Sequence, residues 1–285
     1  MKFLLLFGLI FLTSLLPAQI THPKASPYSE ITQHVGLTSI TIKYSRPGTK
    51  GRKVFGNLVP YGRIWRVGAN ASTKFTVDTD IIIQGKMLPT GTYALYAFPE
   101  EDKWEIVFHN NTTHWGDGRT AYNPEEDELR IKVEPDTIPY TQENFLISFD
   151  SLDHNSASMQ LIWEKTRVSI PISVPTDDLM MGQINKQISG SPTAQTYYEA
   201  ARYLQEQGKE HQTALNYLEK AISIGGDTYY YYRVKSLVQA KLGDYKAAIL
   251  SAQRSLDLAK KEGKDEFVRM NEKNIIAWKQ LLENK

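Results

Sequence analysis

Apolar side chains occupy every second position in several short segments between about residues 35 and 174. Ile40 and Ile42, for example, alternate with Thr41 and Lys43. The same alternation recurs at 104–108, 129–133, 145–149, 159–163 and 168–174. Alternation is typical of strands with one buried face, and we count about nine of them, with no clear helix. Short strands separated by Gly- and Pro-containing turns predict an antiparallel β-sandwich or barrel, of which we favour the sandwich.

The spacing of apolar residues changes after Pro175. Pro192 and Thr193 resemble a helix start, and helical spacing continues from there to the end. The segment 176–192 contains Pro, Gly and Ser and is expected to link the two halves, although 179–188 has the length of a short helix. The predicted plan is a two-domain β + α protein, with a β-sandwich at 24–175 and a helical domain at 193–285.

The helical half contains an internal repeat. Two segments superimpose at a spacing of 34 residues, which aligns Ala214 with Ala248, Leu218 with Ala252 and Ala221 with Ser255. Small residues at fixed positions let helices approach closely, and the pattern resembles the tetratricopeptide repeat. Two repeats are fewer than such arrays usually need, so a last helix at about 265–283 is expected to cap them. Repeat surfaces often bind protein segments, which suggests a protein partner. Packing within the chain is the alternative.

The N-terminus has the pattern of a secretory signal. Lys2 precedes an apolar run at 3–16, and Pro17, Ala18 and Gln19 follow it. The run is shorter than the roughly 20 residues of a membrane span, so we expect a signal peptide at 1–18 that is cleaved after Ala18. An uncleaved anchor is the alternative. No later stretch is apolar enough to span a membrane, which predicts an exported protein, periplasmic or secreted.

Composition excludes several kinds of chemistry. The chain has no cysteine, which excludes disulfides, thiolate metal sites and cysteine nucleophiles. Its formal net charge of +1 lacks the basic excess of a nucleic-acid binder. The motifs of serine hydrolases, P-loop proteins, zinc proteases and dinucleotide-binding folds are absent. We therefore expect no cofactor and no nucleic-acid partner.

One stretch is strongly basic. Residues 31–77 contain eight Lys and Arg and no Asp or Glu. Arginine presents a planar fork of donors for carboxylate, phosphate or sulfate, and tryptophan stacks on sugar rings. This composition predicts a site for an anionic or carbohydrate ligand. The candidate residues are Ser45, Arg46, Lys50, Arg52, Trp65, Arg66, Asn70 and, from a later loop, Trp115.

A structural explanation of the same stretch is open. Residues 100–153 contain 14 acidic and 4 basic residues. If the two segments face each other in the sandwich, the basic stretch is the cationic half of an internal set of ion pairs. The partners of the arginine side chains distinguish the two explanations.

A second candidate is the polar loop at 108–127. His109, His114 and Asp117 have side chains that bind metals, and long loops often carry function. However, the two histidines are five residues apart with no regular element between them. A turn at Trp115 and Gly116 that packs its own indole explains part of this loop without a metal.

Several motifs point to a family. The sequence contains S-R-P at 45–47, K-G-R at 50–52, F-G-N-L-V-P-Y-G at 55–62 and W-R-V-G-A-N at 65–70, with a later Trp163-Glu164. This order resembles the DUF2911 family, bacterial exported proteins of unknown function, over about residues 24–175. The resemblance implies an N-terminal domain of this extent and helical repeats after it. Some members carry enzyme names such as lipoamide dehydrogenase, but this chain lacks the cysteine pair and dinucleotide motif of that chemistry.

Three functions remain open from the sequence. The first is a non-enzymatic binding or scaffold protein, with a ligand site in the β domain and a protein partner on the repeats. The second is a hydrolase of envelope or extracellular polysaccharide or peptidoglycan, with two acids from 100–153 as acid and base. The third is a purely structural module.

Overall fold

The computed structural model describes residues 22–116 and 119–284. The predicted signal peptide at 1–18 lies outside the described residues. The chain divides into two compact units, with the boundary between Thr176 and Asp177. Each unit is described separately below.

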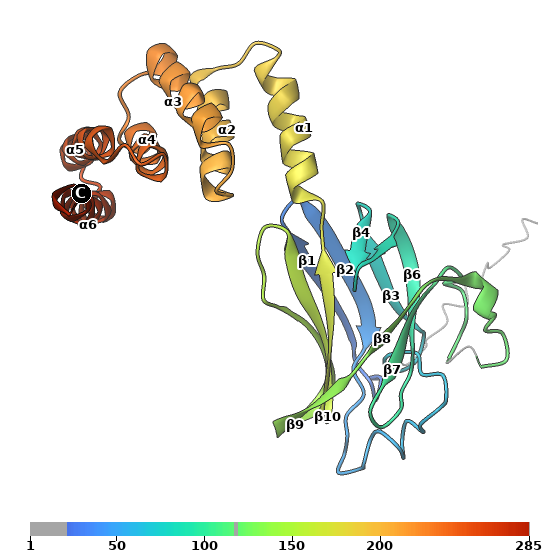
Figure 1. Ribbon diagram of the computed structural model, residues 1–285. Helices are drawn as coiled ribbons and strands as arrows, with labels where there is room; N and C mark the ends of the chain where they lie inside the picture. Colours follow the sequence, from blue (N-terminus) through green and yellow to red (C-terminus); the bar gives the residue numbers. More distant parts are fainter. Residues whose placement is uncertain (1–21, 117–118, 285) are drawn as a thin grey trace, which may run out of the picture. The chain divides into compact units, whose positions relative to one another are not determined.

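The first unit consists of two antiparallel sheets (Figure 1). Its described elements are β1 (Tyr28–Val35), β2 (Thr38–Ser45), β3 (Thr73–Val77), β4 (Ile81–Ile83), β5 (Lys86–Leu88), β6 (Gly91–Phe98), β7 (Trp104–His109), the short 3-10 helix η1 (Pro124–Glu126), β8 (Asp127–Val133), β9 (Pro135–Asp150) and β10 (Ser156–Ser173). One sheet has the order β1-β2-β3-β6-β7-β8 and the other β5-β4-β10-β9. The predicted antiparallel β-sandwich is confirmed.

The core lies between the two sheets. Ile40 and Ile42 from β2 are 0% exposed and join Phe145 from β9 and Ile170 from β10 in one apolar cluster. Thr41 and Lys43 face away from it, as the alternation predicts.

Strands β6 and β7 are buried on both faces. Their outward residues Ala94, Tyr96 and Val107 form a separate cluster with Ile64 and Tyr122. These last two residues belong to the loops 46–72 and 110–123, which therefore cover the outer face of the sheet. Most of the candidate site residues lie in the same two loops, and Ser45 and His109 are the last residues of β2 and β7.

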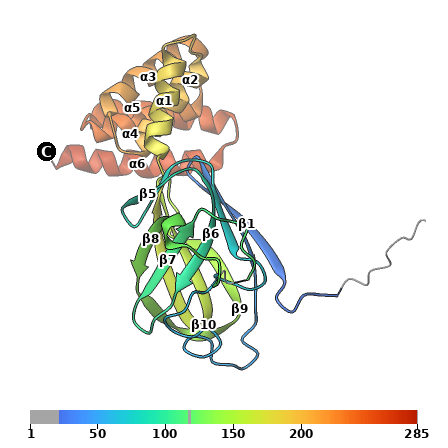
Figure 2. The ribbon, with the colours of Figure 1, turned by 90° about the vertical axis from the view of Figure 1, so that its right-hand side faces the viewer.

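The second unit is helical (Figure 2). It contains α1 (Thr176–Ile188), α2 (Ala194–Glu206), α3 (His211–Gly225), α4 (Tyr229–Lys241), α5 (Tyr245–Lys261) and α6 (Asp265–Glu283). The segment expected to be a linker is thus mostly helix α1. Ile184 of α1 packs with Ala200 and Tyr203 of α2, and the Tyr203 hydroxyl donates to the Asp177 carboxylate. The short helix considered at 179–188 lies within α1, and its apolar face packs on α2.

The internal repeat corresponds to buried helix contacts. All six aligned positions, Ala214, Leu218, Ala221, Ala248, Ala252 and Ser255, are 0% exposed. The final helix packs on α5 through Ile275 and Trp278. Among the described residues, no helix is long and apolar enough to cross a membrane.

Candidate functional site

The loop 46–72 connects β2 to β3 without regular structure and is fixed in place by backbone hydrogen bonds. Trp65 and Ala97 exchange two hydrogen bonds of 2.8 Å, and the Thr49 amide donates to the Glu143 carbonyl at 2.9 Å. Lys50 and Val67, both at φ 50°, have left-handed backbones, which are unfavourable for residues other than glycine. Such conformations persist where the surrounding structure enforces them, and they cluster at functional sites.

An aromatic cluster lies under the loop. Trp65 and Trp163 stack with ring centroids 5.9 Å apart and an interplanar angle of 20°. Phe55 and Phe145 both contact Trp65 edge-on. The two indole N–H groups donate to the carbonyls of Gly68 and Glu143. Because Trp65 is only 7% exposed, it acts mainly as the floor of the site.

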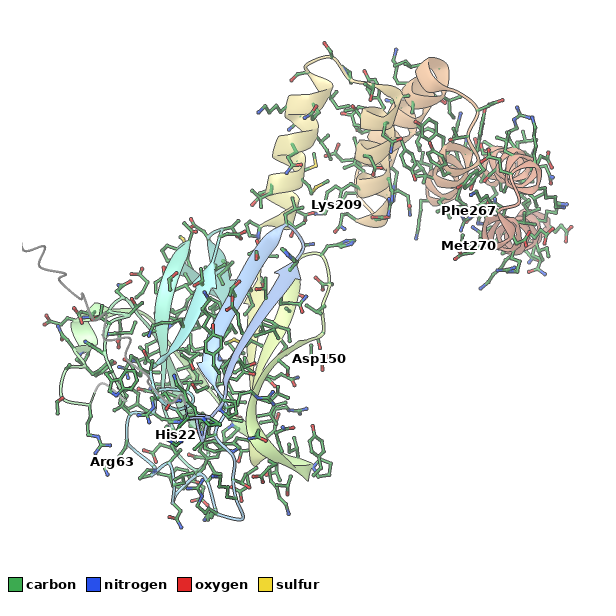
Figure 3. All side chains as sticks on the ribbon, turned by 180° about the vertical axis from the view of Figure 1, so that it is seen from behind. His22, Arg63, Asp150, Lys209, Phe267 and Met270 are labelled. Carbon is green, nitrogen blue, oxygen red and sulfur yellow. The ribbon has the colours of Figure 1, made fainter. Side chains whose placement is uncertain are left out.

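A pocket of about 460 Å³ opens above this floor. Its charged lining residues are Lys50, Arg52, Arg63, Arg66 and Arg119. Pro47, Leu58, Val59, Pro60 and Ile64 contribute apolar walls. No acidic residue lines it in the part of the chain that the structure describes. Figure 3 shows the Arg63 side chain at the edge of the β unit.

Two of the arginine side chains, Arg52 and Arg66, have no described acidic side chain as a direct partner. Arg52 donates from Nε to the Thr49 carbonyl at 2.8 Å and from Nη2 to the Gly48 carbonyl at 2.9 Å. The Nε of Arg66 is buried and has no hydrogen-bond partner. Neither guanidinium is within 4.0 Å of a described acidic oxygen.

Among the described residues, Glu143 is an acid from the segment 100–153 that accepts hydrogen bonds from the basic stretch. The Glu143 carboxylate accepts a hydrogen bond from the Thr49 hydroxyl and one of 2.9 Å from the Lys50 amide. These bonds, with the nearby positive charge of Arg52, hold the pKa of Glu143 below its usual range. Glu143 therefore fixes the rim of the pocket and stays charged.

The other ion pairs of that acidic segment lie elsewhere among the described residues. Glu105 and Asp127 pair with Arg130, and Asp136 pairs with Arg167. The described side chains thus do not form the ion-pair set between the two segments that the structural explanation requires.

Four of the eight candidate ligand-binding residues line the pocket: Lys50, Arg52, Trp65 and Arg66. Three others hold the loop. Arg46 donates from Nε to the Phe145 carbonyl at 2.9 Å, and Asn70 donates to the Ser45 hydroxyl at 3.1 Å. Trp115 is 76% exposed and pairs through its backbone with Ala71, so it lies outside the pocket.

The candidate list omitted Arg63, Arg119 and Trp163, which also line the pocket. Arg63 lies within the basic stretch that the sequence identifies. Arg119 lies in the loop considered for metal binding, and Trp163 lies in a family motif. These three residues are far apart in the sequence, and they line one pocket because two loops fold toward strand β10. The sequence contains no local signal for this arrangement.

The loop 110–123 brings two of the metal-ligating candidates together. His109, at the end of β7, and His114 lie close to Glu126 of η1, and one potential ligand atom of each lies within 4.8 Å of the others. Asp117, the third candidate, lies outside the described residues. Glu126 was not expected as a partner. It lies next to His109 because β7 pairs with β8, which places His109 opposite Asp127, the residue after Glu126.

The hydrolase alternative gains no support from the pKa shifts. A glycosidase general acid has a raised pKa. The described carboxyl groups whose pKa the structure moves are all lowered: Glu105, Glu143, Asp153, Asp177 and Asp227. Each accepts hydrogen bonds that favour its charged form.

Comparison with known proteins places the β unit. Residues 26–172 match the model of a family described as "Protein of unknown function (DUF2911)". No curated protein and no solved structure gives a significant match to the chain. The matched segment includes both loops that form the pocket.

Proposed function

The chain belongs to the DUF2911 family, and from its pocket we propose that it is a non-enzymatic binding protein for a small ligand that carries a phosphate, sulfate or carboxylate group. The observation that carries this proposal is the buried Nε of Arg66, which has no hydrogen-bond partner, in a residue that lines a pocket with four other cationic side chains. An unsatisfied buried donor costs about 1–3 kcal/mol. A bound oxyanion satisfies this donor and offsets the clustered charge.

The pocket also limits the size and shape of the ligand. Its volume of about 460 Å³ lies in the usual range for small-molecule sites, roughly 300–1,000 Å³. Apolar side chains such as Leu58 and Ile64 line part of it and suit the body of a sugar or similar ring. A monosaccharide with an anionic group fits both the charged and the apolar walls.

Hydrogen bonds prepare Arg52 for this role. Two backbone carbonyls hold its guanidinium from one side, which reduces the entropy lost when a ligand binds. Carbonyls carry no net charge, so the positive charge stays available for an anion. Arginine forks of this kind recognise phosphate and carboxylate by paired hydrogen bonds.

We also propose a protein-binding role for the helical unit, as a tetratricopeptide-like array in an exported protein. Leu250 is 72% exposed and Ile276 60% exposed on its helices. Exposed apolar side chains of this size are typical of contact surfaces when they lie together. The test is cross-linking of the full chain in its cell of origin, with Leu250→Ser and Ile276→Ser as variants; cross-linked partners that both variants keep in full would contradict this role.

The ligand proposal is tested by isothermal titration calorimetry with glucose 6-phosphate and inorganic phosphate, and with glucose as the neutral control. We expect both phosphates to bind and glucose to fail. Arg52→Gln and Arg66→Gln should each weaken binding of the phosphates about 10- to 100-fold, because a hydrogen bond to a charged group contributes about 1.5–3 kcal/mol. Higher salt should also weaken it.

The matched control is Lys246→Gln, which removes an exposed charge from α5 in the other unit. It should bind glucose 6-phosphate as the unmodified protein does. Equal affinities of the Arg52, Arg66 and Lys246 variants would show that any binding is not in the pocket. No binding of either phosphate would remove the support for an anionic ligand.

A further inference from the structure

We propose that His109, His114 and Glu126 form a binding site for a divalent transition-metal ion of the zinc type. The three side chains come from the end of β7, the following loop and the helix η1. Their ligand atoms all lie within 4.8 Å of one another. The site is distinct from the basic pocket, because none of these residues lines it.

His109 is the central residue of the site, and its hydrogen bonds define its tautomer. Its side chain is 0% exposed, and Nδ1 lies 3.0 Å from Oδ1 of Asp127. Asp127 already accepts hydrogen bonds from the Tyr122 hydroxyl at 2.7 Å and from Nη2 of Arg130 at 2.7 Å. A carboxylate with these donors is itself an acceptor, so Nδ1 of His109 must carry the proton. The lone pair of His109 is therefore on Nε2.

That lone pair has no hydrogen-bond donor. Nε2 of His109 and Nδ1 of His114 are both buried atoms without a partner. The nearest polar oxygen to Nε2 that forms an ion-pair contact is Oε2 of Glu126, at 3.4 Å, and it is also an acceptor. The lone pair of His109 Nε2 thus faces a carboxylate oxygen of Glu126, and the two repel each other unless a proton or a metal cation lies between them.

The ligand types indicate which cation fits. Imidazole nitrogen and carboxylate oxygen together suit Zn²⁺ and neighbouring first-row ions, whereas Ca²⁺ and Mg²⁺ prefer oxygen alone. The hydrogen bond from His109 to Asp127 is the carboxylate–histidine arrangement that orients histidine ligands in metal sites. Three protein ligands leave a fourth position for water.

The site requires a small contraction. With bonds of about 2.0–2.1 Å in tetrahedral geometry, ligand atoms lie about 3.3 Å apart. The His109 ring is fixed by the sheet, but His114 and Glu126 lie outside the strands, and the Glu126 side chain is 40% exposed. Movement of these two side chains brings the ligands to bonding distance.

The experiment uses the untagged full chain, treated with chelator and titrated calorimetrically with ZnCl₂, with Co²⁺ absorption as a second readout. We expect one equivalent of Zn²⁺ to bind and to raise the melting temperature. His114→Gln and Glu126→Gln should each weaken Zn²⁺ binding about 100-fold or more, and Asp127→Asn about 10-fold or more.

The control variant is His34→Gln, whose exposed side chain lies on β1; it should bind Zn²⁺ normally. Melting curves in chelator show whether each variant is folded, and the His114 variant is the most informative because it changes a loop side chain. Two results would overturn the proposal: no heat and no Co²⁺ spectrum with the unmodified protein, or undiminished binding by folded His114→Gln and Glu126→Gln. In either case a shared proton, not a metal, accounts for the cluster.

Discussion

At the scale of residues, Arg66 points to the site because it combines a buried donor that has no acceptor with a place in the pocket. The Nε of Arg66 and that of Arg167 are both buried without a hydrogen-bond partner, but the Arg167 guanidinium pairs with Asp136, whereas Arg66 lines the basic pocket. The adjacent Trp65 differs from Arg66 in this respect, because its indole N–H donates to the Gly68 carbonyl. The sequence identifies Arg66 as a cation in a basic stretch. It does not show that the side chain lacks an acidic partner, because this depends on where residues 100–153 fold.

Glu143 gives a pH prediction at the same scale. Its folded-state pKa lies below the ordinary value of 4.5, chiefly because the Thr49 hydroxyl donates to it. Its contribution to stability is therefore complete above pH 4.5 and is lost as the pH falls below that value. The Glu143→Gln protein should therefore lose less stability than the unmodified protein when the pH is lowered. The measurement is the melting temperature of both proteins from about pH 7 down to about pH 3.

The comparison for that series is Asp150→Asn, which changes an exposed carboxyl group at the end of the same strand. It should retain the acid dependence of the unmodified protein. If the melting temperature of Glu143→Gln falls as steeply with decreasing pH as that of the unmodified protein, this carboxyl group does not anchor the loop.

At the scale of elements, the loop 46–72 is joined to the sheets by hydrogen bonds and by a few buried side chains. It is joined to β6, β9 and β10 through Trp65, Thr49 and Val54, the last by a 2.8 Å hydrogen bond from its amide to Glu164. Glu164 itself has φ 56° and interrupts the register of β9 and β10. Two residues of the family motifs, Trp65 and Glu164, thus act by supporting the pocket.

Replacing the floor of the pocket should destabilise the β unit. Trp65→Ala removes a side chain that is 7% exposed and should lower the free energy of unfolding by about 3–5 kcal/mol. Trp115→Ala, at a position 76% exposed, should change it by less than about 0.5 kcal/mol. Urea denaturation followed by circular dichroism measures both, and equal losses would contradict the assigned roles.

The sequence predicts regular elements better than loops. Alternation identifies β2, because that strand has one buried face, and fails to describe β6, which is buried on both faces beneath Ile64 and Tyr122. Helix α1 was expected mainly as a linker because its apolar residues are spaced by polar and small ones. The cluster at His109 required the hairpin register that places Asp127 opposite it, a pairing that composition does not specify.

At the scale of the whole molecule, the chain contains two units with separate apolar cores. The helical unit has its own clusters around Leu218 and around Trp278, and its boundary lies at Asp177. We infer that its stability does not depend on the ligand pocket. The period-two and helical patterns of the sequence predict this division because each half carries its own repeating apolar face.

A fragment of residues 177–285 should therefore fold alone. We expect a helical circular dichroism spectrum and a cooperative thermal transition, since each helix packs on its neighbours in the chain. Ala214→Asp, at a position 0% exposed, should abolish that transition, whereas Lys246→Gln should leave it unchanged. A fragment without helical signal would show that the unit requires the β-sandwich.

The central claim is that the basic pocket of the β unit binds an oxyanion. A crystal structure of the full chain with glucose 6-phosphate tests it most directly. We predict phosphate density within hydrogen-bond distance of the guanidinium groups of Arg52 and Arg66, with the sugar against the apolar wall. An empty pocket at saturating ligand, or a phosphate bound only at another surface, would contradict the claim.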